Sequence, residues 1–108
     1  MEISSAHRYL SLIVTAYNEE EALPKLVNEI VRDMSEWACL ELIIVNDGSL
    51  DQTQKVMEDL AHTFAHLAWL DIKLIQFKKN RGMGAALKAG FAVATQDWVS
   101  FLPGDGQI

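Results

Sequence analysis

Tyrosine and acidic side chains come within a few residues of the ends of two short apolar runs in the first half of the chain. Tyr17 and Glu19 come after the run 10–14, and Asp47 comes after the run 42–45. Carboxylates accept hydrogen bonds from the hydroxyl and N–H groups of polar ligands. In an open parallel sheet, the carboxyl ends of the strands line the crevice where ligands bind, and the helices that follow turn free N–H groups toward it. We therefore expect the first half of the chain to hold a nucleotide-like ligand.

The elements that must position these residues can be predicted from the spacing of apolar residues. Short apolar runs are typical of buried strands, whereas apolar residues three and four apart are typical of amphipathic helices. The two patterns alternate, giving strands at 10–14, 40–45, 70–77 and 98–102 and helices at 23–37, 49–64 and 84–94. Ser49 and Gln52 have the spacing of a capping box, which predicts that the second helix begins there. The first helix is predicted to end near Trp37.

The order βαβαβαβ predicts an α/β fold with a Rossmann-like parallel sheet, because each parallel connection must return along a face of the sheet. No linker or repeat divides residues 1–108, so we expect a single domain. A fourth strand that ends the sheet normally pairs further or is covered. The chain is therefore expected to be the front part of a longer domain. The strand edge at 98–102 is expected to allow a homodimer.

Composition narrows the class of protein. The formal net charge is −6, and the short basic segment Lys78, Lys79 and Arg81 suits one ligand phosphate better than a nucleic-acid surface, so no nucleic-acid partner is expected. The single cysteine, Cys39, is expected to be a buried thiol in a reducing compartment. No window approaches the roughly 18 apolar residues of a spanning helix. We expect no membrane segment, and a location in the cytoplasm or at the cytoplasmic face of a membrane.

Four sequence blocks together resemble the N-terminal half of a family 2 glycosyltransferase with the GT-A fold, and the dolichyl-phosphate mannosyltransferase-like branch fits best. The blocks are Val14–Glu20, Ile44–Thr53, Asn80–Ala86 and Phe101–Gln107, in the family's order and spacing. The resemblance implies transfer of a sugar from a UDP- or GDP-sugar donor to an acceptor such as a polyprenyl phosphate or a saccharide. This chain would supply the donor-binding half of such an enzyme.

The resemblance also implies roles for residues in the first two blocks. Ala16, Tyr17 and Glu19 would contact the nucleoside, and Asp47 would accept a hydrogen bond from a base edge. Asn46 stands where many family members have Asp, and an amide, which also donates, can change which base is read. Two simpler readings stay open. Glu19 could complement the dipole of the following helix, and Asp47 could be a turn residue that holds its own loop.

In the third block, the resemblance implies that Arg81 approaches the donor diphosphate or nucleoside and that Gly82 lets the backbone come close to the ligand. The glycine spacing also resembles a dinucleotide fingerprint. That reading fails because Leu87 stands where a third small residue is needed and because the block follows the third strand. A tight turn without ligand contact is the remaining alternative for Gly82.

The fourth block implies a divalent metal, Mg²⁺ or Mn²⁺, held against the donor diphosphate. Asp105 and Gln107 match the metal-binding positions, but Pro103 replaces the first carboxylate of the usual motif. Because Mg²⁺ can be held by one or two carboxylates together with phosphates, we expect metal binding only when the donor is present. A plain surface turn at 103–106 is the alternative.

The catalytic residues cannot be assigned within this chain. The family expectation is an inverting reaction whose base lies after Ile108, so the chain alone is expected to bind the donor weakly and to transfer little sugar. A non-catalytic nucleotide-binding module, or pseudo-enzyme, is an alternative that Pro103 favours. A receiver-type signalling domain, in which Asp47 would accept a phosphoryl group, fits less well because no acidic pair directly follows the first strand.

Overall fold

The computed structural model describes residues 9–105, which form four strands and three helices in strict alternation. The elements are β1 (Tyr9–Ala16), α1 (Ala22–Asp33), β2 (Cys39–Asn46), α2 (Thr53–Thr63), β3 (Leu70–Gln76), α3 (Met83–Val93) and β4 (Trp98–Pro103). The predicted βαβαβαβ order is therefore confirmed.

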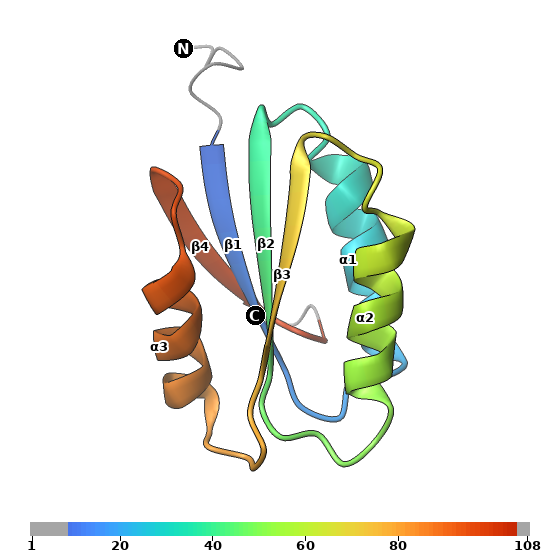
Figure 1. Ribbon diagram of the computed structural model, residues 1–108, viewed down its shortest axis with the longest axis vertical. Helices are drawn as coiled ribbons and strands as arrows, with labels where there is room; N and C mark the ends of the chain where they lie inside the picture. The colour runs from blue at the N-terminus through green and yellow to red at the C-terminus, as the bar shows by residue number, and fades with distance from the viewer. Residues whose placement is uncertain (1–8, 106–108) are drawn as a thin grey trace.

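All four strands belong to one parallel sheet in the order β3-β2-β1-β4 (Figure 1). The two central strands are buried along almost their whole length, as expected for strands covered on both faces. The edge strands β3 and β4 are more exposed. Because β4 pairs with β1, the ends of the first and fourth strands lie side by side.

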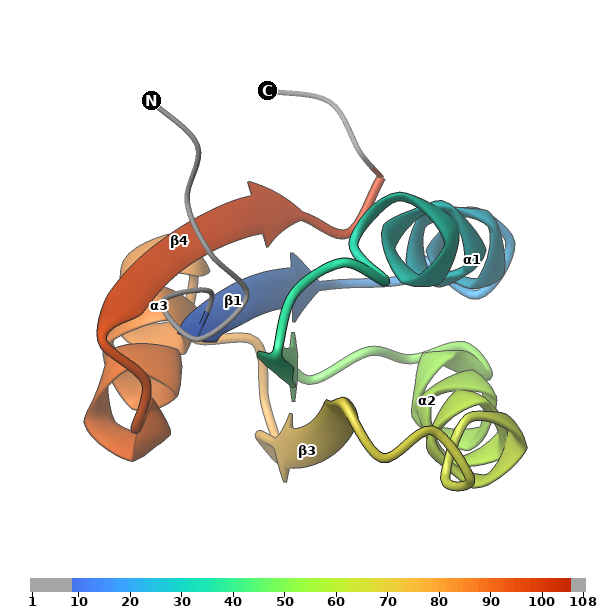
Figure 2. The same cartoon turned by 90° about the horizontal axis from the view of Figure 1, so that it is seen from above.

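Helices cover both faces of the sheet. Seen from above, α1 and α2 lie on one side and α3 lies alone on the other (Figure 2). The larger apolar cluster lies on the α1 and α2 side and includes Leu12, Val14, Leu23 and Met57. On the α3 side, alternate residues of the same strands pack against Ala86 in a smaller cluster. The period of two in the strands thus supplies both halves of the core.

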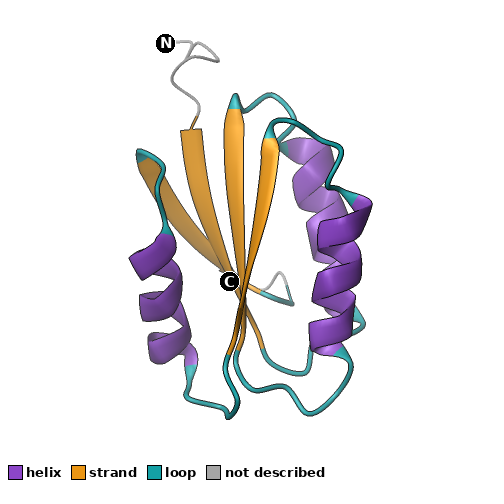
Figure 3. Ribbon diagram, in the orientation of Figure 1, coloured by secondary structure: helices purple, strands orange, loops and turns teal. Residues whose placement is uncertain are grey.

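The loops that follow β1, β2 and β3 all lie at one end of the sheet, at the bottom of the view (Figure 3). This is the carboxyl-terminal edge, as expected from parallel strands. No helix in the described range 9–105 has the length and apolar character needed to cross a bilayer.

Two predicted helix ends are wrong. Helix α1 ends at Asp33 and not near Trp37, because the chain turns after Met34 and the Trp37 N–H donates to the Met34 carbonyl at 3.1 Å. Trp37 packs on the core from that turn.

The capping box at Ser49 is also wrong, since α2 begins only at Thr53. The Thr53 N–H donates instead to the Asp51 carboxylate, at 2.9 Å. Ser49 is used elsewhere, in a contact between two loops.

A charged group is buried on the α3 side, near the amino-terminal end of the strands. Glu41 of β2 is 1% exposed and accepts hydrogen bonds from the Ser11 hydroxyl, from Lys73 and from both the N–H and the hydroxyl of Thr95. Thr95 lies in the segment that leads into β4. Glu41 thereby joins β1, β2, β3 and the start of β4 at one point.

Candidate functional site

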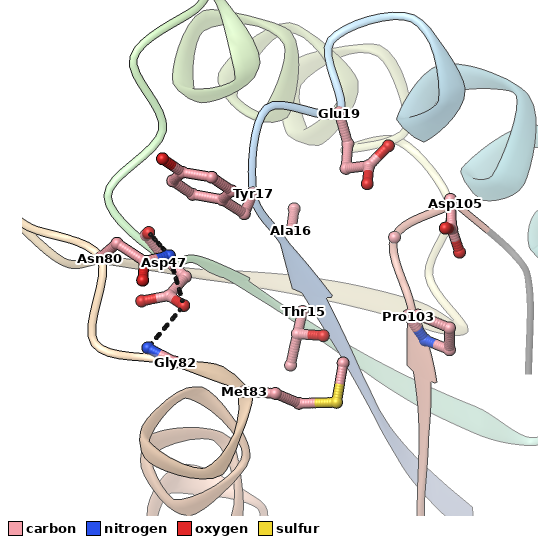
Figure 4. A pocket seen from close by; sticks show the side chains of 11 residues that line it. Thr15, Ala16, Tyr17, Glu19, Asp47, Asn80, Gly82, Met83, Pro103 and Asp105 are labelled. Carbon is pink, nitrogen blue, oxygen red and sulfur yellow. Dashed lines mark hydrogen bonds between the residues drawn. The ribbon is translucent and has the colours of Figure 1, made fainter.

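A pocket of about 270 Å³ opens at the carboxyl-terminal edge of the sheet (Figure 4). Each strand contributes to its wall through its last residues or the loop that follows. The lining residues are Thr15, Ala16, Tyr17, Glu19, Asp47, Asn80, Gly82, Met83, Pro103, Gly104 and Asp105. The structure therefore brings together six predicted site residues, namely Ala16, Tyr17, Glu19, Asp47, Gly82 and Asp105.

Asp47 is 5% exposed and holds the loop between β3 and α3. Its carboxylate accepts hydrogen bonds from the Arg81 N–H at 2.7 Å, the Gly82 N–H at 2.9 Å and the Asn80 side-chain amide at 3.1 Å. Figure 4 draws the bonds to Asn80 and Gly82. The alternative that Asp47 serves a loop is thus partly right, but the loop that it holds follows β3 and not its own strand.

Gly48 brings the same two loops into direct backbone contact. Its φ is +72°, in the left-handed region, and a Cβ added there would lie 2.2 Å from the Lys79 carbonyl carbon and 2.3 Å from the Asn80 nitrogen. Both the conformation and the space therefore require glycine. The wall of the pocket on this side is a fixed pair of loops.

The loops that follow β1 and β2 are joined by reciprocal hydrogen bonds. The Asn18 N–H donates to the Ser49 hydroxyl at 2.9 Å, and the Leu50 N–H donates to Asn18 Oδ1 at 2.8 Å. Asn18 itself has φ +53°, which Asn tolerates better than most residues. The Glu19 N–H donates to the Thr53 hydroxyl at 2.9 Å. This loop brace holds Tyr17 and Glu19 at the pocket.

Two carboxylates share the side of the pocket near β4, those of Glu19 and Asp105 (Figure 4). Burial raises the pKa of the Glu19 carboxyl, and the negative charges of Asp105 and Asp51 raise it further. A cation or a group of hydroxyl donors placed there would relieve this repulsion.

Two of the predicted donor-binding residues do not line the pocket. Asn46 is buried, and its side chain accepts from the Ser49 N–H and donates to Gln54, both at 3.0 Å. The Arg81 guanidinium lies over the Phe77 ring, 4.7 Å from its centroid, in a cation–π contact. Gln107, the predicted second metal-binding residue, lies outside the described residues.

Besides Gly104, sequence reasoning did not single out three of the lining residues, Thr15, Asn80 and Met83. All three sit inside recognised blocks but carry no charge that would mark them. Asn80 is revealed by its bond to Asp47, a contact between residues 33 apart in the chain. Only the pairing of loops in space identifies its role.

The oxygen ligands of this pocket are of the kind that Mg²⁺ and Mn²⁺ prefer. Asp105 supplies one carboxylate, Glu19 lines the same pocket, and Pro103 supplies none. Within residues 9–105, no group of three or more His, Cys, Asp or Glu side chains could hold a metal ion by itself. The chemistry of the site therefore fits a divalent cation only together with oxygens of a bound ligand.

Comparison with known proteins gives a consistent family. The sequence matches the model for glycosyl transferase family 2 over residues 11–108. A dolichyl-phosphate beta-glucosyltransferase of Trichomonas vaginalis is 36% identical over 104 residues, covering 91% of this chain and 31% of the relative. The chain thus spans about a third of the length of the curated relatives it matches.

Solved structures share the fold. A mannosyltransferase of Pyrobaculum calidifontis, in complex with GDP-Man and Mn²⁺, superposes with a TM-score of 0.79 at 24% identity over 94% of this chain and 29% of that chain. TarS of S. aureus, in complex with UDP-GlcNAc, superposes with a TM-score of 0.73 at 27% identity, over 90% of this chain and 26% of that chain. Both are GT-A fold glycosyltransferases, so the expected fold class is confirmed.

Proposed function

The chain belongs to glycosyl transferase family 2, and from this membership we propose that residues 1–108 are the donor-binding domain of an enzyme that transfers a sugar from a nucleoside diphosphate sugar. The observation that carries the proposal is the convergence of all four strand ends on one pocket with three carboxylates, those of Glu19, Asp47 and Asp105. Such a crevice is where open α/β sheets bind nucleotides. The family membership leaves the receiver-type alternative without support.

We assign the nucleoside to the wall formed by Ala16, Tyr17 and Asp47. A carboxylate offers about four acceptor positions on its two oxygens. Three acceptor positions of the Asp47 carboxylate take hydrogen bonds from the loop after β3, so one position remains for an N–H of the base. Glu19 would accept hydrogen bonds from ribose hydroxyls. Such donors would offset the burial and the repulsion from Asp105 that raise the pKa of its carboxyl. Asn46 would act on the nucleoside only indirectly, through the loop after β2 that it holds. Arg81 would act only through the loop after β3, to which it belongs.

A divalent cation, Mg²⁺ or Mn²⁺, would be held by Asp105 with Gln107 and by the donor's own phosphates. When bound, the cation would offset the charge that develops on the departing nucleoside diphosphate. The GDP-Man and Mn²⁺ complex of a protein with the same fold supports this proposal. Asp105 would serve to orient the cation against the ligand.

The acceptor is proposed to be a polyprenyl phosphate, because named relatives such as the Trichomonas protein are dolichyl-phosphate transferases. Such an acceptor would place the protein at the cytoplasmic face of a membrane. The catalytic base is proposed to lie after Ile108. The chain alone is therefore expected to bind donor without transferring sugar at a measurable rate.

Calorimetric titration with UDP and with GDP, each with and without Mn²⁺, tests the proposal. We expect one nucleotide to bind more tightly, Mn²⁺ to strengthen that binding, and Asp47→Ala to weaken it about tenfold or more, as for a hydrogen bond to a charged group. Asp33→Ala, which removes an exposed carboxylate at the far end of α1, is the matched control and should bind as the wild type does. A folded wild-type chain that binds neither nucleotide would contradict the proposal.

A non-catalytic nucleotide-binding module is the second candidate, and Pro103 favours it because the residue removes one carboxylate from the metal position. The two functions differ in the longer protein and not in this domain. Turnover of a UDP- or GDP-sugar by that protein with a polyprenyl phosphate would exclude the non-catalytic candidate.

A homodimer through the edge strand β4 is also proposed. Trp98, Val99 and Phe101 of that strand are 61%, 42% and 51% exposed, and an unpaired apolar edge is a template for strand pairing. Sedimentation velocity over a range of chain concentrations tests whether a second copy occupies this edge.

A further inference from the structure

Thr15 is a polar side chain in the pocket whose hydrogen-bonding capacity is not used by the described part of the protein. The residue is 8% exposed and lines the pocket between Met83 and Pro103 (Figure 4). Its backbone carbonyl accepts from the Gly104 N–H at 2.7 Å. Its hydroxyl takes part in none of the hydrogen bonds formed within residues 9–105.

The hydroxyl oxygen must open into the pocket. Among the described residues, no fully buried side-chain nitrogen or oxygen lacks a hydrogen-bond partner. The Thr15 oxygen has no such partner, so it is not fully buried, although the residue as a whole is nine-tenths buried. Its small accessible surface therefore faces the cavity that the residue lines.

Packing does not explain a hydroxyl at this position. Along β1, Thr15 is on the same side of the sheet as Ile13, and its register partner on β2 is Val45. Both neighbours belong to the apolar cluster under α3. Valine has the shape of threonine without the cost of leaving a hydroxyl unsatisfied in an apolar setting.

Ser11, on the same strand, is an example of a hydroxyl that has a structural role. It lies four residues earlier on the same side, donates to Glu41 at 2.6 Å and accepts from the Gln96 N–H at 3.1 Å. Thr15 has no such partners. The difference indicates a partner that is not part of the protein.

The surroundings define the chemistry of that partner. The register partner of Thr15 on β4 is Pro103, which has no N–H, and the Gly104 N–H is already used. The carboxylates of Glu19 and Asp105 accept hydrogen bonds when ionised and do not donate. The Thr15 hydroxyl has one proton to donate, and neither these carboxylates nor any other group within residues 9–105 accepts it, so it is placed to donate to a ligand oxygen in this part of the pocket.

We propose that the Thr15 hydroxyl donates a hydrogen bond to an oxygen of the nucleoside diphosphate and so is a ligand-contact residue of the donor site. The proposal rests on the proposed function, and it adds a contact that carries no charge and that the recognised motifs do not mark. The oxygen belongs either to the nucleoside or to the diphosphate, which share this chemistry.

The test compares Thr15→Val, which keeps the shape and removes the hydroxyl, with Thr15→Ser, which keeps the hydroxyl. Each variant is titrated in a calorimeter with whichever of UDP and GDP binds the wild type more tightly, and with the matching nucleoside and monophosphate. We expect Thr15→Val to bind the diphosphate about five- to tenfold more weakly, as for one lost hydrogen bond, and Thr15→Ser to stay within about twofold.

The smaller ligands identify the oxygen. A loss already seen with the nucleoside assigns the bond to the nucleoside, whereas a loss that appears only with a phosphorylated ligand assigns it to a phosphate. Thermal unfolding of each variant checks that it is folded. If Thr15→Val does not fold, Thr15→Ala replaces it in the same comparison.

Two results would overturn the proposal without touching the proposed function. In one, the wild type binds and Thr15→Val binds equally well. In the other, Thr15→Ser loses as much affinity as Thr15→Val, which would mean that packing and not the hydroxyl matters. A folded wild type that binds neither UDP nor GDP overturns the proposed function and this inference together.

Discussion

Replacing Glu41 by glutamine should destabilise the fold in a manner that depends on pH. The carboxylate is 1% exposed and is held by the Ser11 hydroxyl, by Lys73 and by two groups of Thr95. Glutamine keeps the size of the side chain but exchanges one acceptor oxygen for an NH₂ group and removes the charge. The Lys73 ammonium and one Thr95 donor then lose their acceptor.

The magnitude follows from the pKa of Glu41. Burial by itself raises this pKa, but the hydrogen bonds from Lys73, Ser11 and Thr95 outweigh burial and lower it from 4.5 to about 2. At 1.36 kcal/mol per pKa unit, this shift corresponds to a contribution of about 3 kcal/mol to the free energy of unfolding. Because the pKa is lower in the folded state, the contribution is complete above pH 4.5 and is lost as the pH falls toward 2.

Urea unfolding of the wild type and of Glu41→Gln at several pH values measures this contribution. At pH 7 the free energy of unfolding should differ by about 3 kcal/mol, and the midpoint of thermal unfolding by about 10 °C or more. The difference should shrink steadily below pH 4.5. Glu58→Gln, at an exposed position on α2, is the matched control and should change little.

A difference between the wild type and Glu41→Gln that stays constant from pH 7 to pH 2 would refute this reasoning. It would mean that the charge on Glu41 adds nothing and that only the shape of the side chain matters. A loss well below 1 kcal/mol at pH 7 would refute it as well, because the four donors would then be satisfied equally by water or by the amide.

Two further predictions concern the contact between loops and the edge of the sheet. Gly48→Ala should lower the free energy of unfolding, measured in urea, by at least about 2 kcal/mol, because it adds a Cβ in the left-handed region against the Lys79 backbone. Gly84→Ala, which has open space around the added Cβ, should be neutral or stabilising. Equal effects of the two substitutions would contradict this. In sedimentation velocity, the wild type should associate as its concentration rises and Val99→Lys should not, and a wild type that stays monomeric throughout would exclude the dimer.

The sheet and its helices could be predicted because their signals are local. The apolar run 42–45 identifies β2, and the stripe from Leu23 to Met34 identifies α1, without knowledge of any distant residue. Helix ends were less predictable. The start of α2 depends on whether Ser49 or Asp51 accepts the first free N–H, and Ser49 is already engaged by Asn18 of another loop.

Site residues could be predicted where a charged side chain lies at the carboxyl end of a strand. Glu19, Asp47 and Asp105 carry charges at the carboxyl ends of strands, and all three line the pocket. The use of Asp47 by the loop after β3 was not predictable, since it depends on residues more than 30 positions away. Thr15 was missed because an unused hydroxyl can be recognised only after every neighbouring partner is known.

The loop brace around Asn18 also has a mechanical consequence. On the side of the pocket that we propose for the nucleoside, the loops after β1, β2 and β3 are joined to one another through Asn18, Asp47 and Gly48, so they should move together as one rigid unit. The end of β4 is joined to β1 by the bond from Gly104 to Thr15. Every strand end that lines the pocket is therefore tied to a neighbour, so the pocket should keep its shape when a ligand binds and should not close around it.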